Sequence, residues 1–177
     1  MKPIDNDLRS LMRTAHEEIF SAIVPAPFGA LGIRTSDNHR LRELVYLPPS
    51  TMHLTPTTKV AEDAAHQIER YFGDRDFVFS LPLALAGTAF QQKVWQVIAA
   101  IPRGAVLTYG DIARRIGSAP RAVGQACGAN WFPLVIPCHR VTAAAGLGGF
   151  SNHSEAGGFH LGVKRWLLAH EGMDAYV

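Results

Sequence analysis

Thr108–Gly128, with the sequence TYGDIARRIGSAPRAVGQACG, predicts two short helices joined by a tight turn. The first helix has a short apolar face around Ile112, and we expect it to end at Gly117, because glycine readily takes the left-handed conformation that follows many helices. A second helix is expected from Arg121 to Ala129, after a turn that closes at Pro120. This pattern is typical of a helix-turn-helix, although a helical hairpin that only stabilises the core has the same pattern.

The second of these helices is rich in small residues. It lacks the long polar side chains that read base edges in the major groove. Small residues such as Ala122 and Gly124 allow the backbone to approach DNA closely, which favours sequence-independent binding with Arg121 inserted into the base stack. The plainer interpretation of Arg121 is a surface charge.

Leu134–Val141, with the sequence LVIPCHRV, is an apolar run that ends at a cysteine beside a histidine and an arginine. A thiolate is the reactive form of cysteine, so His139 is a candidate base for Cys138, and Arg140 supplies a positive field. Adjacent side chains on a strand point to opposite faces, so His139 reaches Cys138 only if the backbone turns there, which Pro137 favours. The alternative is a buried cysteine beside a surface histidine.

An acidic residue completes this set of candidate catalytic groups. Gly162–Glu171 is predicted to form the final helix, with Glu171 near its end. Cysteine, histidine and an acid can serve as nucleophile, base and orienting group. A negative charge at a helix C-terminus is unfavourable to the helix dipole, which favours a functional role for Glu171 over a residue that only occupies the last turn.

Composition and charge set limits on the class of protein. The chain has 177 residues, 47% of them hydrophobic and 18% charged, which is typical of a globular protein. Residues 1–86 carry a net charge of −2 and residues 87–177 a net charge of +4, a mild indication that the second half binds a polyanion. The two cysteines, with no CxxC or HExxH spacing, predict no disulfide framework and no metal site, and we expect a cytoplasmic protein, or a nuclear one if the source is eukaryotic.

The first half is predicted to mix helices and strands. A helix capped by Asp5 or Asn6 is expected to run to about Ile23, and the later expected elements are strands at 29–34 and 42–47, a helix at about 57–71 and a strand at 77–83. A change to helical sequence near residue 86 divides the chain into an N-terminal scaffold domain, 1–86, and a C-terminal domain, 87–177, that begins with a helix capped by Thr88.

Several segments in order carry a resemblance to a known family. They are GTAFQQKVW from Gly87, IPRG from Ile101, TYGDIA from Thr108, RAVG from Arg121, Asn130, PCHRV from Pro137 and the helix from Lys164 to Glu171. With them, residues 87–177 resemble the O6-alkylguanine-DNA alkyltransferases, or methylated-DNA–protein-cysteine methyltransferases. The resemblance implies an α+β fold, with a ribonuclease-H-like N-terminal domain containing a small antiparallel sheet and a helical C-terminal domain with a winged-helix-like helix-turn-helix.

The resemblance also implies an activity. Such proteins act once each, without a cofactor, by moving an alkyl group from O6 of guanine, and in some cases O4 of thymine, to a cysteine. Here Cys138 would be the acceptor, with His139 and Glu171 activating it and Asn130 ordering the turn that carries it. The implied partner is double-stranded DNA containing O6-alkylguanine, bound by a monomer with no membrane association.

Further residues take their roles from the same resemblance. Tyr109 would contact the phosphate and N3 of the flipped guanine, and Arg121 would fill the space that the base leaves. The DNA-binding residues are expected to be Tyr109, Arg121, Ala122, Gly124 and Arg140, and the substrate pocket is expected to contain Tyr109, Cys127, Val141, Phe150 and Ser151.

One segment departs from the family pattern. The loop between the nucleophile and the last helix is longer than usual after Ser151, over residues 152–160. This extension is expected to bring His153, Glu155 and His160 near the pocket mouth. It could widen the tolerance for bulky alkyl groups, touch DNA, partly block the pocket or form a disordered flap.

Three other functions fit parts of this sequence pattern. A non-catalytic binder of alkylated DNA would follow if the extended loop blocked the pocket, but such proteins lack the cysteine that Cys138 provides here. A cysteine hydrolase would leave the helix-turn-helix and Arg121 unexplained. A transcription regulator would need a recognition helix with more base-reading side chains than this one has.

Overall fold

The computed structural model describes residues 19–37 and 39–176, and the chain forms two compact units. The first unit takes the chain up to Arg70 together with Ser80–Ala84, and the second takes Tyr71–Phe79 and the chain from Leu85 onward. The division into domains at residues 86 and 87 stays a prediction, and the contacts group Tyr71–Phe79 with the second unit.

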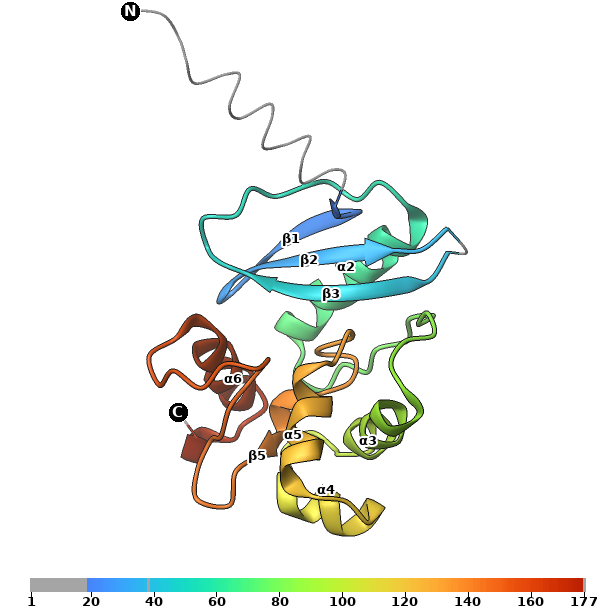
Figure 1. Cartoon of the computed structure of the whole chain (residues 1–177). Coiled ribbons are helices and arrows are strands. Elements are labelled where there is room, and N and C mark those ends of the chain that lie inside the picture. Colours follow the sequence, from blue (N-terminus) through green and yellow to red (C-terminus); the bar gives the residue numbers. More distant parts are fainter. Residues whose placement is uncertain (1–18, 38, 177) are drawn as a thin grey trace, which may run out of the picture. The chain divides into compact units, whose positions relative to one another are not determined.

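The first unit contains a small antiparallel sheet. Its strands β1 (Ala22–Ala26), β2 (Gly29–Thr35) and β3 (Leu41–Leu47) lie in the order β1-β2-β3, so that each is joined to the next by a short connection (Figure 1). The strands predicted at 29–34 and 42–47 are confirmed as β2 and β3. Pro48 and Pro49 follow β3 directly, because proline cannot donate a hydrogen bond to a strand ladder.

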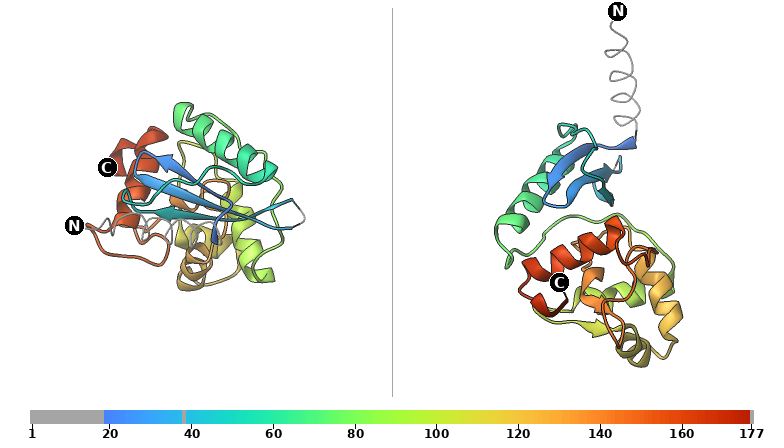
Figure 2. Two further views of the ribbon diagram at one scale, coloured as in Figure 1. Left: turned by 90° about the horizontal axis from the view of Figure 1, so that it is seen from above. Right: turned by 90° about the vertical axis from the view of Figure 1, so that its left-hand side faces the viewer.

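Helix α2 (Lys59–Gly73) lies across one face of this sheet (Figures 1 and 2). It confirms the helix predicted at about 57–71. Its apolar residues recur at helical spacing and are buried, as are the inward-facing residues of the sheet, because burial of apolar surface drives this packing. The buried side chains of the first unit include Ile23, Leu31, Ile33, Leu41, Leu44, Val60, Ala61, Ala64 and Ile68.

One predicted helix boundary and one predicted strand of the first half are wrong. The helix expected from Asp5 or Asn6 to Ile23 lies mostly outside the described residues, and its last part is strand β1, since Ile23 pairs with Gly32 of β2 and its backbone exchanges two hydrogen bonds with Leu54. The strand expected at 77–83 does not form. Pro82 has no N–H to donate there, and only an isolated bridge joins Leu83 to Leu41.

The second unit is mainly helical. Helices α3 (Ala89–Ala99), α4 (Tyr109–Ile116) and α5 (Pro120–Gly128) pack on one another, and α6 (Phe159–His170) packs on the single turn η1 (Cys138–Arg140). A parallel pair of two-residue strands, β4 (Leu107–Thr108) and β5 (Val141–Thr142), joins the start of α4 to the residues after η1, and η2 (Asp174–Tyr176) follows α6. Across residues 19–37 and 39–176, none of the helices combines the length and the apolar character needed to cross a membrane.

The two helices predicted from Thr108–Gly128 are confirmed as α4 and α5. Thr108 and Asp111 form a capping box at the start of α4, and Gly117 ends it at φ 68°, in the left-handed region. Pro120 begins α5, where its missing N–H costs nothing. The indole N–H of Trp95 on α3 donates to the carbonyl of Ala126, 2.8 Å away, so α5 is held against α3 by a buried hydrogen bond.

Thr88 caps α3 in the same way, and this predicts a measurable stability effect. Its hydroxyl accepts from the Gln91 N–H, and the Gln91 side chain accepts from the Thr88 N–H. Thr88→Ala should lower the free energy of unfolding of the second unit by about 1 kcal/mol, the usual value of a lost N-cap. Urea unfolding followed by tryptophan fluorescence reports on this unit, because all 3 tryptophans (Trp95, Trp131 and Trp166) lie in it. Thr88→Ser keeps the acceptor and should retain most of the stability, and equal losses in both variants would contradict the capping role.

Candidate active site

Cys138 lies at the start of the single turn η1, where the backbone bends after Pro137. Its N–H donates to the carbonyl of Ile136, 2.8 Å away, and its own carbonyl accepts from the Val141 N–H. The side chain of Cys138 is buried, with 4% of its surface exposed. The turn predicted at Pro137 is therefore present, and Cys138 and His139 do not lie on opposite faces of a continuous strand.

Asn130 holds the chain that leads to this turn. Its side-chain amide donates to the carbonyl of Ile136, 2.8 Å away, and its side-chain oxygen accepts from the N–H of Phe132, 2.9 Å away. The Asn130 side chain thus supplies hydrogen bonds to two backbone groups of the irregular segment 131–137, which has no regular secondary structure to satisfy them. The Asn130 side chain also acts to lower the pKa of the Cys138 thiol, against the larger effect of burial.

The carboxylate of Glu171 gathers three side chains around it. Oε1 accepts from Nε2 of His139 at 2.9 Å, from a terminal nitrogen of Arg140 at 2.8 Å and from the hydroxyl of Tyr71 at 2.9 Å. Oε2 accepts from Nε of Arg140 at 2.9 Å. Glu171 and His139 are each 1% exposed. Burial alone would raise the pKa of Glu171, but the hydrogen bonds from His139 and Arg140 outweigh it and hold the pKa well below its usual value.

This arrangement assigns the proton on His139. Because Glu171 is an ionised acceptor, the hydrogen between it and Nε2 belongs to the imidazole. Nδ1 is then the basic nitrogen, and no hydrogen-bonding group of the described residues contacts it. Burial lowers the pKa of His139 against the opposing influence of Glu171, so the ring is neutral and able to accept a proton at Nδ1.

Cys138 itself is held as a thiol. Burial raises its pKa, while the Asn130 side chain and the nearby charge of Lys164 act in the opposite direction. Reaction of this cysteine as a nucleophile therefore requires a base, and the next residue in the chain is one.

Lys164 is a buried cation beside the site. Its ammonium, on a residue that is 0% exposed, donates to the carbonyls of Val141, Leu147 and Gly149 at 2.6, 2.7 and 3.0 Å. Burial lowers its pKa to about 8, so it remains mostly charged at neutral pH. Three carbonyl acceptors satisfy all three donors of the ammonium, and the loop after Cys138 is thereby pinned to α6.

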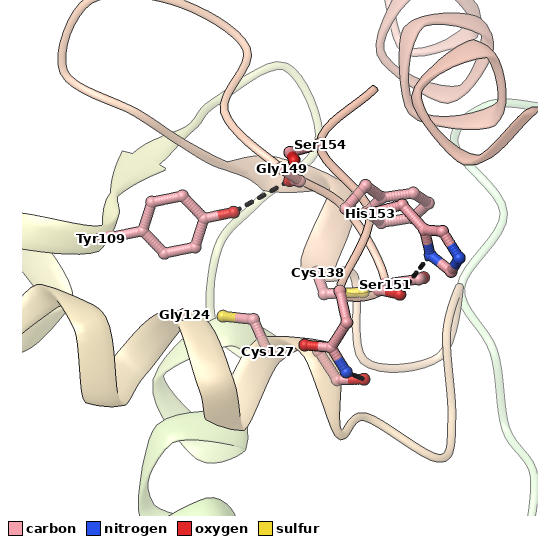
Figure 3. A pocket seen from close by; sticks show the side chains of 11 residues that line it. Tyr109, Gly124, Cys127, Cys138, Gly149, Ser151, His153 and Ser154 are labelled. Atoms are coloured by element: carbon pink, nitrogen blue, oxygen red, sulfur yellow. Dashed lines mark hydrogen bonds between the residues drawn. The ribbon is translucent and has the colours of Figure 1, made fainter. Parts of the chain in front are cut away.

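A pocket with a volume of about 220 Å³ opens over Cys138 (Figure 3). The sulfur-bearing side chains of Cys138 and Cys127 both line it, and the hydroxyl of Tyr109 donates across one side to the carbonyl of Gly149, 3.0 Å away. Burial raises the pKa values of Tyr109 and Cys127, so both stay protonated at neutral pH. The lining residues are Tyr109, Gly124, Cys127, Gly128, Cys138, Gly149, Phe150, Ser151, Asn152, His153 and Ser154.

Other predicted site residues lie outside this pocket. Arg121 is exposed at the second residue of α5, and Ala122 is half-buried beside it. Val141 is buried and does not line the pocket. Its N–H donates to the carbonyl of Cys138, and its carbonyl accepts from Lys164. Arg140, expected to contact DNA, directs its guanidinium to Glu171 and to the carbonyl of Ile101 instead.

The sequence analysis missed Lys164 and Tyr71 as parts of the site. Lys164 had a visible signal, because it is a charged residue within the apolar stripe of α6 between Leu161 and Leu168. No sequence signal pointed to Tyr71, since 100 residues separate it from its partner Glu171. Among the described residues, no group of three or more histidine, cysteine, aspartate or glutamate side chains could hold a metal ion.

Glu171→Gln should destabilise the protein in a pH-dependent way. At pH 7 the variant leaves the Arg140 charge without its buried partner, at a cost of about 3 kcal/mol. Because the folded-state pKa of Glu171 is lowered, its contribution is complete above the unfolded-state pKa and is lost as the pH falls from there toward the folded-state value. Urea unfolding between pH 7 and about pH 3.5 should therefore show the two proteins converging in acid.

The matched control is Glu155→Gln, which removes an exposed carboxylate. It should change the free energy of unfolding by less than about 0.5 kcal/mol at every pH. A constant difference between Glu171→Gln and the unmodified protein across the pH range would contradict the assigned charge of Glu171.

Comparison with known proteins places this site in a family. Residues 89–173 match the family model described as the DNA-binding domain of 6-O-methylguanine DNA methyltransferase. The chain is 42% identical to the regulatory protein Ada of Salmonella typhimurium over 132 residues, which cover 73% of this chain but only 35% of Ada. It is 42% identical over 111 residues to a methylated-DNA–protein-cysteine methyltransferase of Mycobacterium bovis, covering 62% of this chain and 67% of that protein.

A solved structure extends the match to both units. Mycobacterium tuberculosis OGT in complex with DNA superposes with a TM-score of 0.70 at 36% sequence identity, covering 85% of this chain and 91% of that one. The mixed helix-and-sheet fold with a small antiparallel sheet is therefore shared, and the resemblance inferred from the sequence is confirmed. On this evidence the chain belongs to the 6-O-methylguanine DNA methyltransferase family.

Proposed function

We propose that this protein repairs alkylated DNA directly, by transferring a methyl or other alkyl group from O6 of guanine to Cys138. The observation that carries the proposal is the position of Cys138, which lines the pocket while its neighbour His139 is hydrogen-bonded to the buried carboxylate of Glu171. Relatives named methylated-DNA–protein-cysteine methyltransferase, such as those of Mycobacterium bovis and Bacillus subtilis, support it.

Proton transfer from the thiol starts the reaction. Burial keeps Cys138 protonated, so Nδ1 of His139 takes its proton, directly or through one water. Glu171 stabilises the resulting imidazolium through Nε2, as the acid of a catalytic triad does. Arg140 and Tyr71 keep the carboxylate in place for this role.

Alkyl transfer follows by displacement at carbon. The thiolate of Cys138 attacks the alkyl carbon, the new S–C bond forms as the C–O6 bond breaks, and the electron pair of the broken bond stays on the guanine. Tyr109 keeps its proton and can donate a hydrogen bond to N3 of the departing base. The proton held by His139 neutralises the guanine, and the stable thioether that remains means that each molecule acts once.

The DNA-binding surface is proposed to be α4 and α5, acting as a helix-turn-helix of the winged-helix kind, and the first unit is proposed to be a ribonuclease-H-like scaffold. Ala122 and Gly124 let the backbone of α5 approach the minor groove, and the exposed Arg121 fills the space that the flipped guanine leaves. The complex of the Mycobacterium tuberculosis relative with DNA supports this partner. One copy of the chain supplies every group named, so the acting species is a monomer.

The decisive variants are Cys138→Ser and Cys127→Ser, which change the two cysteines of the pocket in turn. After mixing with an oligonucleotide carrying O6-methylguanine, intact mass should show one added methyl group in the unmodified protein and in Cys127→Ser, and none in Cys138→Ser. Peptide mapping should place the group on Cys138. Transfer retained in Cys138→Ser would remove the proposed acceptor, and lesion binding without transfer in the unmodified protein would indicate a non-catalytic binder.

Arg121→Ala should separate DNA handling from the transfer step. Without the Arg121 side chain, the space left by the flipped base stays empty and less of the unstacking cost of a few kcal/mol is recovered. Transfer from O6-methylguanine in duplex DNA should therefore be slower by about tenfold or more. The rate with free O6-benzylguanine should stay within about twofold, because no base is displaced from a stack. Arg165→Ala, which removes an arginine from α6, is the control and should leave both rates unchanged. Equal slowing of both substrates by Arg121→Ala would contradict the displacing role.

A further inference from the structure

The extended loop between Phe150 and α6 forms part of the pocket wall. We refer to residues 151–158 as the strap. Four of its residues, Ser151 to Ser154, line the pocket on one side, and Gly124, Cys127 and Gly128 of α5 line it on another (Figure 3). Of the residues expected at the pocket mouth, His153 lines the pocket, while Glu155 and His160 do not.

A tight turn sets the direction of the strap. Phe150 and His153 exchange two backbone hydrogen bonds of 2.8 Å, and the two residues between them, Ser151 and Asn152, have φ values of 50° and 63°. Two successive left-handed residues are the signature of a narrow hairpin turn, and asparagine tolerates this conformation better than most residues. The backbone strain at Ser151 indicates that the surrounding contacts hold the turn in place.

Asn152 joins the strap to the opposite wall. Its side-chain amide donates to the carbonyl of Gly128, the last residue of α5, at 3.2 Å. Gly128 leaves room for this contact, because a Cβ atom there would overlap the Asn152 side chain. At this point of the pocket rim, the hydrogen bond from Asn152 therefore depends on glycine at position 128.

The rest of the strap is fixed to α6. The ring of His153 stacks on His160 with centroids 3.8 Å apart and an interplanar angle of 11°. Arg165 donates to the carbonyl of Ala156 at 2.9 Å. These contacts tie the strap to the helix behind it, whereas the Asn152 contact joins two walls of the pocket and so limits how far they can separate.

We propose that the hydrogen bond from Asn152 to Gly128 is a latch that determines which alkyl groups the pocket accepts, favouring methyl over bulky aromatic groups. This rests on the proposed transfer to Cys138. The pocket holds about 220 Å³, below the range of about 300–1,000 Å³ common for ligand sites. A benzyl group must push the strap away from α5 and break the latch, and a methyl group need not.

The test compares transfer rates from oligonucleotides carrying O6-benzylguanine and O6-methylguanine, followed by intact mass. Asn152→Asp keeps the shape of the side chain and its tolerance for the left-handed region but removes the donor. The ratio of the benzyl rate to the methyl rate should rise about fivefold, the equivalent of one neutral hydrogen bond. Asn152→Gly should give a rise at least as large, without backbone strain at that position.

Gly128→Ala completes a double-mutant cycle. Alone, it should displace the Asn152 side chain and raise the ratio as Asn152→Asp does. Combined with Asn152→Gly, it should add nothing further, because the overlapping side chain is gone. Arg165→Ala loosens the strap only where it meets α6 and should leave the ratio within about twofold.

Three outcomes would overturn the latch. They are an unchanged ratio in Asn152→Asp and Asn152→Gly, effects of Gly128→Ala and Asn152→Gly that simply add, or an equal rise in Arg165→Ala. Each can be observed while the unmodified protein still methylates Cys138. If the unmodified protein transfers neither alkyl group, the proposed function fails as well, so the two failures are distinguishable.

Discussion

The second unit is organised around one buried, ionised side chain, the carboxylate of Glu171. A buried carboxylate is tolerated only when charged or hydrogen-bonding partners surround it. Glu171 has three such partners from two places in the chain: Tyr71 near the end of α2, and His139 and Arg140 in the turn η1. The same contacts therefore hold the end of α6 against the turn η1 and fix the tautomer of His139, the neighbour of Cys138. Structural stability and chemical competence rest on one side chain.

Burial keeps Cys138 in its less reactive thiol form. The buried Cys138 has a raised pKa and stays a thiol. This suits the proposed transfer, in which each molecule reacts once and would be lost by reacting with another electrophile. His139 and Glu171, the proposed base and orienting acid, and Asn130, which holds the turn, already have these hydrogen bonds without substrate. What substrate adds is the electrophilic carbon itself, placed in a pocket that already contains the sulfur.

Local signals predicted much of the second unit. Thr88, Gly117 and the small residues of α5 act through neighbours a few positions away, so the helices they delimit could be located from sequence. Cys138, His139 and Glu171 were recognisable by residue type, and the structure brings the last two together. The predicted N-terminal helix was extended to about Ile23, into the start of strand β1. The pairing of this strand with β2 and Leu54 is decided by tertiary contacts that the apolar spacing around Ile23 does not reveal. The contacts of Lys164 and the Asn152–Gly128 bond likewise join segments that no short pattern connects.

The ammonium of Lys164 has a consequence for how this region tolerates change in chain length. By binding the carbonyls of Val141, Leu147 and Gly149, it anchors the loop up to the residue before Phe150. Residues 151–158 follow this anchor, so changes in their number need not alter the hydrogen bonds of Lys164 or the turn at Cys138. This region therefore combines a fixed segment that carries Cys138, the proposed acceptor, with a following segment whose length can vary and which forms part of the pocket wall.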